Sequence, residues 1–470
     1  AECHGGLILH KQQRTQRLRA ESGRRGVRRS GIKEEAAGRG TAAELKGTAR
    51  KRLTMLYLKL KPRNKRNYAM QTASPSATTV DCVKHLIGFD TTSRNSNLAL
   101  IDWSAEILAG HGATIRRSFN ADRSKANLFA TFGEGPGGVV LSGHTDVVPV
   151  DGQAWRSNPF EAQVRDGLLY GRGACDMKGF IGVALAHAAQ FAKAPLRSPI
   201  HFALSYDEEV GCLGIPVMLS ELALAGIRPD GCVVGEPTDM QVVTAHKGGQ
   251  AYRCRVHGRA AHSSLTPRGV NAIEYAARVI TFIQDMAWNE EHQGLQVEGF
   301  GVPYSTLSTN VISGGNGKNI IPAECEFFFD MRYVPGVDPD QLIERIRRYI
   351  TDELEPRMRA RFPEAAVELE RIFDVPMLDA AEQGSITLLA KSLLRHHASG
   401  KVSYGTEAGF FQGAGIPTVV CGPGSIDQAH RADEFVSLSQ LHQCERFMQN
   451  LIERLSTAPA VDYRAEQAMA

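Results

Sequence analysis

Acidic residues and histidines follow short apolar runs at five points of the chain, which is a pattern typical of metal centres. The residues concerned are His144, Asp146, Asp176, Glu208, Glu209, Glu236 and His430. Imidazole and carboxylate groups suit a pair of Zn²⁺ or Co²⁺ ions better than copper or an iron–sulfur cluster. The nine cysteines are never spaced as C-x-x-C, so we expect no thiolate ligands. This ligand set predicts the activation of water by two divalent cations.

The local sequence around each candidate indicates how its side chain is directed. His144 and Asp146 are two residues apart at a strand end and point to the same side, so one can bind a metal while the other orients it. Asp176 lies in the glycine-rich turn GRGACDMKG before a helix, where a carboxylate can bridge two cations. Glu208 and Glu209 are adjacent and must point in different directions, so one can bind metal while the other faces the water. Each signal is weak alone, and the prediction rests on their joint placement.

Alternating helical and β-rich segments must position these residues. We expect helices at 80–88, 98–110 and 437–455 and strands at 127–131, 137–143, 200–205, 231–235 and 416–422. This alternation predicts an α/β fold with a largely parallel sheet flanked by helices. Open sheets of this kind bind ligands outside the carboxyl ends of their strands, which is where the acidic residues and histidines lie.

A different order of elements occupies residues 248–372. We expect strand, helix, strand, strand, helix and strand at 249–256, 270–286, 305–312, 323–333, 339–354 and 365–372. This βαββαβ order is typical of a ferredoxin-like domain, whose exposed sheet face and edge suit pairing into a homodimer. The sequence therefore predicts a dimerisation domain inserted between two parts of a catalytic domain, 70–247 and 373–470.

The first 69 residues differ in charge from the rest of the chain. Residues 1–69 contain 19 Lys and Arg but 5 Asp and Glu, whereas residues 70–470 contain 35 basic and 46 acidic residues. The stretch has little apolar periodicity, so we expect a disordered basic extension. A nucleic-acid-binding arm and an organellar transit peptide are alternatives. The favoured interpretation is an extension that is not native, because Met70 directly precedes the first globular pattern.

The sequence contains no pattern typical of membrane insertion or export. No apolar stretch approaches the roughly 18 residues needed to cross a bilayer. The scattered cysteines suit a reducing compartment. We therefore expect a cytoplasmic protein without a membrane partner, and we do not expect nucleic acid as a partner.

Seven strings, in order along residues 75–455, resemble the zinc-dependent exopeptidase and deacylase family. They are SGHTDVVP, GRGACDMKG, DEEVG, GEPT, AAHSS, GGNGKNIIPAECEFFFDMR and a late AH. That family contains acetylornithine deacetylase, succinyl-diaminopimelate desuccinylase, aminoacylase and the glutamate carboxypeptidases. The segments GHTDVVPVDGQAWRSNPF, STNVISGGNGKNIIPAECEFFFDMRYVPG and GTEAGFFQ are most similar to the acetylornithine deacetylase branch, which serves arginine biosynthesis. The resemblance implies metal-dependent hydrolysis of N-acetyl-L-ornithine, a small N-acyl amino acid, to L-ornithine and acetate.

The resemblance also implies how the metal ions would be held. One metal would be bound by His144 and Glu236, and the second by Glu209 and His430. Asp176 would bridge the two. The ions would be Zn²⁺, with Co²⁺ as an alternative.

Further residues would handle the proton, the oxyanion and the substrate. By the resemblance, Asp146 would orient the neighbouring imidazole, and Glu208 would take a proton from water and pass it to the departing amine. His262, on the inserted domain, would stabilise the oxyanion in the active site of a partner subunit. Arg332 would hold the substrate α-carboxylate by a fork of hydrogen bonds, with Asn319 nearby.

Alternatives remain for individual residues and for the function. Arg332 could instead form an ion pair with Asp330 or another neighbour. Glu407, in the GTEAG string, is expected to face the side-chain ammonium of ornithine. The other enzymatic interpretations are a succinyl-diaminopimelate desuccinylase, an aminoacylase and a carboxypeptidase-type hydrolase. A non-catalytic binding protein is disfavoured, because every expected ligand and the expected base are present.

Overall fold

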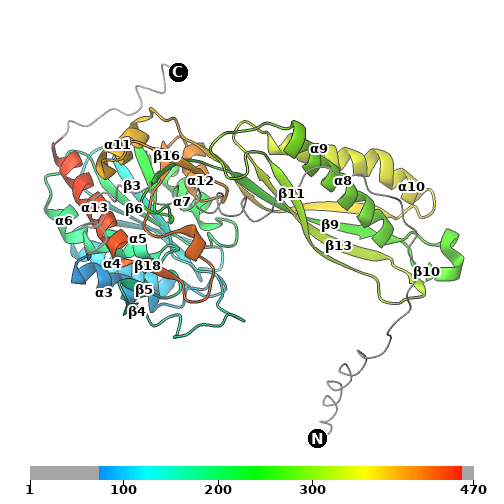
Figure 1. The fold of residues 1–470 in the computed structure, drawn as a ribbon, viewed down its shortest axis with the longest axis horizontal. Helices are drawn as coiled ribbons and strands as arrows, with labels where there is room; N and C mark the ends of the chain where they lie inside the picture. Colours follow the sequence, from blue (N-terminus) through cyan, green and yellow to red (C-terminus); the bar gives the residue numbers. More distant parts are fainter. Residues whose placement is uncertain (1–73, 458–470) are drawn as a thin grey trace, which may run out of the picture. The chain divides into compact units, whose positions relative to one another are not determined.

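A largely parallel sheet forms the centre of the larger part of the molecule, outside the inserted unit (Figure 1). The computed structural model describes residues 74–457, so the predictions for residues 1–69 lie outside the described residues. Within the described range the sheet has nine strands in the order β1-β2-β6-β3-β7-β17-β8-β15, with β16 pairing with β8. Strands β6, β3, β7 and β17 run parallel to one another. The predicted fold class is confirmed.

The strands of this sheet are short and mostly buried. Their bounds are β1 Thr114–Phe119, β2 Ala126–Phe132, β3 Val139–His144, β6 Ile200–Ser205, β7 Gly231–Val234, β8 Val242–His246, β15 Leu378–Asp379, β16 Ser399–Val402 and β17 Thr418–Val420. The helices of the same part are α3 Ala77–Ile87, α4 Leu98–Gly110, α5 Lys178–Ala186, α6 Ala188–Lys193, α7 Gly214–Leu224, α11 Ser385–Leu394, α12 Ala408–Gly413 and α13 Leu438–Thr457. A 3-10 helix spans Ile426–Gln428.

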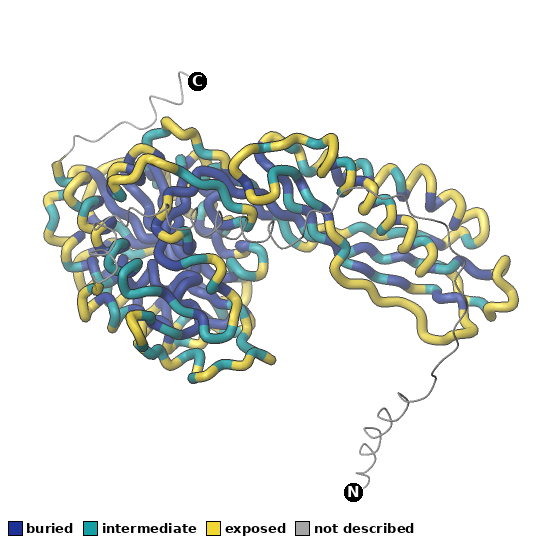
Figure 2. The backbone as a smooth tube through the Cα atoms, viewed as in Figure 1, coloured by how far each residue is buried: buried dark blue, intermediate teal, exposed yellow. Residues whose placement is uncertain are grey.

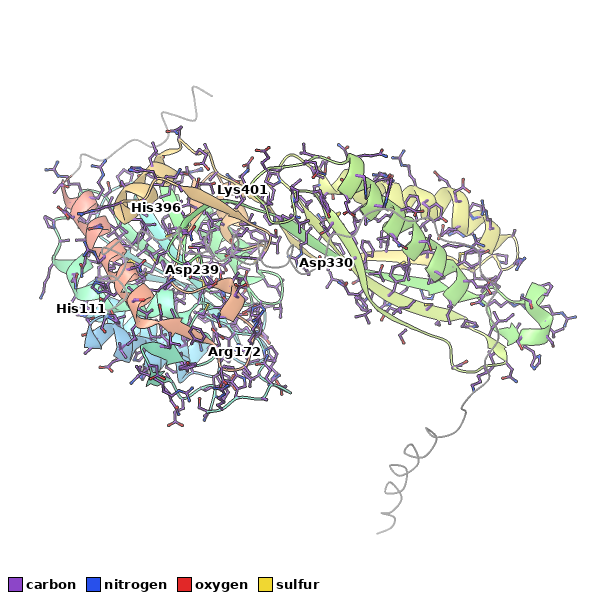
Figure 3. All side chains as sticks on the ribbon, viewed as in Figure 1. His111, Arg172, Asp239, Asp330, His396 and Lys401 are labelled. Carbon is purple, nitrogen blue, oxygen red and sulfur yellow. The ribbon has the colours of Figure 1, made fainter. Side chains whose placement is uncertain are left out.

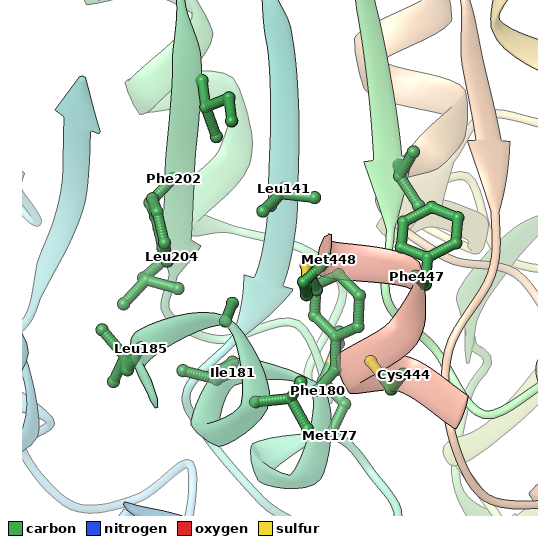
Figure 4. Close-up of a cluster of buried hydrophobic side chains, with 14 of the residues drawn as sticks. Leu141, Met177, Phe180, Ile181, Leu185, Phe202, Leu204, Cys444, Phe447 and Met448 are labelled. Atoms are coloured by element: carbon green, nitrogen blue, oxygen red, sulfur yellow. The ribbon is translucent and has the colours of Figure 1, made fainter. Parts of the chain in front are cut away.

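Helices cover both faces of the sheet because both faces are apolar. In β3, Val139 and Leu141 pack with α3, α4, α5, α6, α11 and α13, whereas Val140 packs with α7 and α12. This alternation follows from the period of two along a strand. Figure 4 shows the first of these cores, where Leu141 lies near Phe180 of α5 and Phe447 of α13. The buried sheet is the rigid support on which the candidate site is built.

Helix α3 is tied to α13 by one buried carboxylate. Its cap Ser76 accepts a hydrogen bond from Thr79 N at 3.2 Å. On α13, Glu445 Oε1 accepts hydrogen bonds from Ser76 N at 2.8 Å, Ser76 Oγ at 2.7 Å and Thr79 Oγ1 at 2.6 Å. The contact joins the first and last described helices and involves none of the candidate ligands.

A small antiparallel sheet was not predicted from the sequence. Its strands are β4 Gln163–Arg165, β5 Leu168–Tyr170 and β18 Phe435–Ser437. Strand β18 pairs with β5, and Phe435 lies opposite Tyr170. The pairing brings the segment after His430 beside the segment that leads to Asp176.

The inserted unit contains a four-stranded antiparallel sheet in the order β11-β13-β9-β14. Its elements are β9 Gly248–His257, α8 Ala272–Gln293, β11 Thr306–Gly314, β13 Glu324–Tyr333, α9 Pro339–Arg348, α10 Glu355–Arg359 and β14 Ala366–Val375. Two short strands, β10 Ala261–His262 and β12 Ile320–Ile321, pair with each other, and a 3-10 helix spans Ser263–Arg268. The predicted βαββαβ order is confirmed. The unit has its own core, which supports a separate domain, although the boundaries at 248 and 372 stay predictions.

The helix expected at 339–354 is present, but its helical type changes along its length. Helix α9 ends at Arg348, a π-helical segment spans Tyr349–Leu354, and α10 starts at Glu355. Pro356 has no N–H and cannot continue the hydrogen bonds of an α-helix, which accounts for a change of helical type just before it. The predicted helix at 339–354 is therefore confirmed, and only its change to a π-helical segment was not predicted.

Figure 2 shows dark blue interior strands and exposed outer segments. Residues 310–320, which include the end of the edge strand β11, are all exposed. Within residues 74–457, no helix is both long and apolar enough to span a membrane.

Candidate active site

The carboxyl ends of the parallel strands carry the candidate residues. His144 is the last residue of β3, the pair Glu208–Glu209 follows β6, and Glu236 follows β7. His430 lies in the loop after β17, and Asp176 lies in the turn before α5. These are adjacent strands of one sheet, so their carboxyl ends meet at the same edge.

Two groups of three potential metal ligands share Asp176. One group is His144, Asp176 and Glu236, the other is Asp176, Glu209 and His430, and the ligand atoms of each group lie within 4.8 Å of one another. Asp176 Oδ1 lies 2.9 Å from His144 Nε2, and Oδ2 lies 3.2 Å from His430 Nε2. Glu236 Oε1 is 3.5 Å from His144 Nε2, and Glu209 Oε2 is 3.1 Å from His430 Nε2. The structure thus brings together all five residues predicted as ligands.

Burial and mutual repulsion shift the acidic groups of this cluster. Burial, together with the Asp176 carboxylate, raises the pKa of Glu209 to about 7 and that of Glu236 well above its usual range. Hydrogen bonds to Asp176 and Glu209 raise the pKa of His430 to about 10. Near neutrality, protons on Glu209, Glu236 and His430 therefore offset the crowded negative charge, a task that bound cations could take over. Two imidazoles and three carboxylates of this kind fit a pair of divalent cations.

Asp146 holds the segment that carries the two adjacent glutamates. Its carboxylate accepts hydrogen bonds from Glu208 N at 3.0 Å, Glu209 N at 3.3 Å and Ser93 Oγ at 2.7 Å. His144 Nδ1 lies 2.9 Å from the backbone oxygen of Asp146 and 3.6 Å from its Oδ1. The backbone carbonyl thus lies nearer to the imidazole than the carboxylate does, and the predicted orienting role of Asp146 stays a prediction.

Glu208 lies beside the two groups without belonging to either. Cys212 Sγ lies 3.5 Å from Glu208 Oε1. Burial, with the nearby carboxylates of Glu209 and Asp176, raises the pKa of Glu208 well above its usual range. A carboxyl group with a raised pKa is suited to accept and return a proton near neutral pH.

Glu407 is completely buried behind the strand ends. Its carboxylate accepts hydrogen bonds from Ser205 Oγ and, at 3.4 Å, from Ser142 Oγ. Burial raises its pKa to about 7. These bonds connect Glu407 to the ends of β3 and β6, a structural contact that the sequence did not reveal. Its predicted contact with the ornithine ammonium stays a prediction.

His262 and Asn319 lie on the inserted unit, outside both groups of ligands. His262 is exposed, and its Nδ1 lies 2.7 Å from Ser264 Oγ. The backbone oxygen of Asn319 accepts a hydrogen bond from Ser263 N at 2.9 Å. Strands β10 and β12 therefore place these two residues near each other, and their predicted roles stay predictions.

Arg332 forms the ion pair that was its alternative interpretation. Its Nε donates to Asp330 Oδ1 at 3.0 Å, and Figure 3 labels Asp330 on the inserted sheet. The guanidinium also lies over Gly249, because a Cβ there would be 2.9 Å from Nη1. A Cβ on Gly405 would lie 3.9 Å from the same Nη1 atom. Because the ion pair uses Nε, the two Nη atoms can still donate a fork of hydrogen bonds to a substrate carboxylate. The substrate-binding role of Arg332 stays a prediction.

Lys247 is a residue that the sequence reasoning missed. Its side chain is buried, and its ammonium donates to the backbone oxygen of Tyr304 at 2.6 Å. Among the described residues no acidic side chain forms an ion pair with it. Burial and the charge of Arg332 lower its pKa. A buried cation beside a second cation indicates affinity for an anion. The sequence signal that could have identified Lys247 is its place in the string HKG, directly after a strand.

Comparison with known proteins agrees with this geometry. Residues 140–454 match the family described as Peptidase family M20/M25/M40. The chain is 34% identical over 392 residues to an acetylornithine deacetylase of Pasteurella multocida (strain Pm70), covering 83% of this chain and 97% of that relative. It is 34% identical over 371 residues to an acetylornithine deacetylase of Proteus mirabilis (strain HI4320), covering 78% and 93% respectively.

The fold is similar to that of solved structures as well. An M20 family metallo-carboxypeptidase of Sulfolobus solfataricus superposes with a TM-score of 0.65 at 16% identity, covering 82% of this chain and 100% of that chain. At this identity the likeness concerns the fold alone. The family match, the extent of the identities and the arrangement of the strand ends lead to one conclusion: the chain belongs to peptidase family M20/M25/M40, and the family resemblance predicted from its sequence is confirmed.

Proposed function

We propose that this chain hydrolyses N-acetyl-L-ornithine to L-ornithine and acetate with the help of two divalent cations, Zn²⁺ or Co²⁺. The observation that carries the proposal is the pair of ligand groups that share Asp176, with Glu208 beside them. The substrate is supported by relatives named acetylornithine deacetylase, which are 34% identical over most of the chain.

Each residue of the site has a task in this proposal. Bound cations would polarise the amide carbonyl and lower the pKa of a water molecule toward about 7. Glu208 takes a proton from that water and gives it to the departing amine. Asp146 holds Glu208 in place through the backbone N–H of that residue. Arg332 and Lys247 provide positive charge for the α-carboxylate of the substrate.

The proposal includes a homodimer built on the inserted unit. Strand β11 is an edge strand with exposed apolar side chains, among them Val311 and Ile312. An exposed edge with apolar residues is a natural place for symmetric pairing. In such a dimer His262 would supply a hydrogen-bond donor to the oxyanion in the partner's active site. A reducing compartment such as the cytoplasm suits the free cysteines of residues 74–457.

One observation favours a second candidate, a desuccinylase. Arg332 and Lys247 place two cations near each other, and only Arg332 pairs with a carboxylate, that of Asp330. A substrate with a second carboxylate, such as a succinyl group, would use both charges. Aminoacylase and carboxypeptidase activities have no such specific support among the described residues.

The experiment is the release of ornithine from N-acetylornithine by protein first stripped with a chelator. We expect no release from the stripped protein and recovery of release as Zn²⁺ or Co²⁺ is returned to two equivalents. Release that is unaffected by the chelator would contradict the two-cation proposal. No release at any metal concentration would contradict the substrate.

A further inference from the structure

Arg172 and Glu434 form a buried ion pair next to the candidate metal ligands. Their side chains are 1% and 0% exposed, and Arg172 Nη1 lies 2.7 Å from Glu434 Oε2. Figure 3 labels Arg172 in the catalytic part of the molecule. Neither residue belongs to a ligand group. We propose that this pair is a positioning device that fixes Asp176 and His430 relative to each other and thereby sets the affinity of the second metal. The inference rests on the proposed two-cation function.

The Glu434 carboxylate accepts hydrogen bonds from the backbone of the turn that contains Asp176. Its Oε1 accepts hydrogen bonds from Cys175 N at 2.9 Å and Asp176 N at 3.1 Å. Its Oε2 accepts from Gly173 N at 3.0 Å and from Arg172. All four partners are donors, so both ends of the side chain must be acceptors. A carboxylate meets this requirement, whereas an amide would point its own N–H groups at two of the donors.

Arg172 extends the connection to the backbone of His430. Its Nη2 donates to Gln153 Oε1 at 2.6 Å, and Gln153 Nε2 donates to the backbone oxygen of His430 at 3.0 Å. Arg172 Nη1 also lies 3.4 Å from the backbone oxygen of Arg431. A continuous chain of hydrogen bonds therefore runs from the Asp176 turn through Glu434, Arg172 and Gln153 to the His430 loop.

The His430 loop needs such a connection more than the other ligands do. His430 has a left-handed backbone conformation, with φ of 62°, and its side chain is 52% exposed. His144 ends a fully buried strand, and Glu236 follows another. The sheet strands therefore position His144 and Glu236, the two ligands that belong to the first group alone, while side-chain hydrogen bonds hold the His430 loop. Loss of the ion pair should therefore affect the second group, Asp176, Glu209 and His430, most.

A purely structural role makes a different prediction. A buried ion pair can be replaced by apolar residues at little cost, but removing one partner leaves an uncompensated charge and destabilises the fold. Lower stability alone would change the melting temperature and leave the relative affinity of the two metals as it was. The relative affinity is thus the informative measurement.

The test is a Zn²⁺ titration of stripped protein by calorimetry with a competing chelator, for the wild type and for Glu434→Gln. We expect the dissociation constant of the second Zn²⁺ to rise about 10–100-fold in the variant, as for other residues that orient metal ligands, while that of the first rises less than about threefold. Glu445→Gln is the matched control, because Glu445 is also buried and accepts three hydrogen bonds, but from Ser76 and Thr79, which belong to neither ligand group. This control should melt at a lower temperature and bind both Zn²⁺ ions as the wild type does.

A second variant covers the case in which Glu434→Gln does not fold. The double variant Arg172→Met, Glu434→Gln removes both buried charges, and it should fold while still binding the second Zn²⁺ at least about tenfold more weakly. Wild-type affinity for both ions in a folded Glu434 variant would overturn the inference, and so would failure of both variants to fold, since the pair would then support the fold alone. A wild-type protein that binds fewer than two Zn²⁺ ions would instead contradict the proposed function on which the inference rests.

Discussion

The metal groups and the tip of the inserted unit differ in how their side chains are held. His144 and Glu236 are buried at the ends of sheet strands, and each lies within 3.5 Å of another ligand of the same group. His262, in contrast, is exposed on a two-residue strand, and its imidazole contacts Ser264 beside it. The first region is assembled by the fold itself. In the proposed function, the second region acts only together with a substrate or a second subunit.

This difference separates two kinds of test. Substitutions in the strand-end region should change chemistry or metal binding within one chain. Substitutions on the inserted unit should depend on the partner chain or on the charge of the substrate.

The largest effect is expected for Glu208→Gln. The amide keeps the size of the side chain but cannot accept a proton, so kcat should fall by about 10²–10⁴ while both metals stay bound. Glu209→Gln is the matched control, because Glu209 contacts His430 directly and should lose the second metal instead. Metal content and kcat are measured for both variants. If Glu208→Gln lost metal and Glu209→Gln kept it, the roles of the two glutamates would be the reverse of those proposed.

His262→Ala should lower kcat by about 10²–10³, the effect of removing one donor to an oxyanion. If His262 acts in the partner's site, mixing the His262→Ala protein with the Glu208→Gln protein should restore part of the activity. The reason is that a heterodimer of the two contains one site with both native residues. Subunit exchange would be verified by giving the two variants different affinity tags and isolating dimers that carry both tags. Verified exchange without any recovered activity would contradict action across the dimer.

Lys247→Met should raise KM about tenfold, which is about 1.4 kcal/mol of binding, with little change in kcat. The reason is the loss of one of the two cations that we propose for binding the substrate carboxylate. Lys401→Met is the control, because Lys401 lies over the ring of Phe300 and is not completely buried. An unchanged KM in a correctly folded Lys247→Met protein would remove Lys247 from the substrate site.

The smallest effect concerns the pH dependence of metal-free protein. Glu209 and Glu407 have pKa values of about 7, above the value of 4.5 for a free carboxyl group, and His430 has a pKa of about 10, above 6.5. All three bind more protons in the folded state, so the free energy of unfolding should fall as the pH rises from 5 to 8. Bound Zn²⁺ replaces protons at Glu209 and His430 and should flatten this dependence. Thermal melts of stripped and loaded protein check both slopes, and a metal-free melting temperature that rises over this range would be the contrary result.

The sequence was sufficient for the elements that carry strong local patterns. The helix at 98–110 and the strand at 200–205 have the predicted bounds, and the predicted ligands lie at strand ends, in a glycine-rich turn or, for His430, in the loop after the last strand of the sheet. Short elements such as the three-residue strands β5 and β18 have too few residues for a periodic pattern. The π-helical segment was missed because Pro356 lies beyond the end of the helix that was expected.

Long-range contacts explain why the proposed roles of Glu434, Arg172 and Lys247 were not predicted from the sequence. Glu434 and Arg172 are 262 residues apart, and the pairing of β18 with β5 places their segments side by side. Lys247 is informative because it is buried without an acidic partner among the described residues, a property of packing rather than of local sequence. Residue type and spacing indicated the metal ligands, whereas the residues that hold them depend on the folded arrangement.

The most direct test of the central claim is a parallel measurement of kcat/KM for metal-loaded protein with N-acetylornithine, N-acetylmethionine and N-succinyl-diaminopimelate. Our account predicts that N-acetylornithine is hydrolysed at least about tenfold more efficiently than the succinylated substrate, a difference of about 1.4 kcal/mol in transition-state binding. A preference for N-succinyl-diaminopimelate would contradict the proposed substrate. It would indicate that Arg332 and Lys247 bind the succinyl carboxylate.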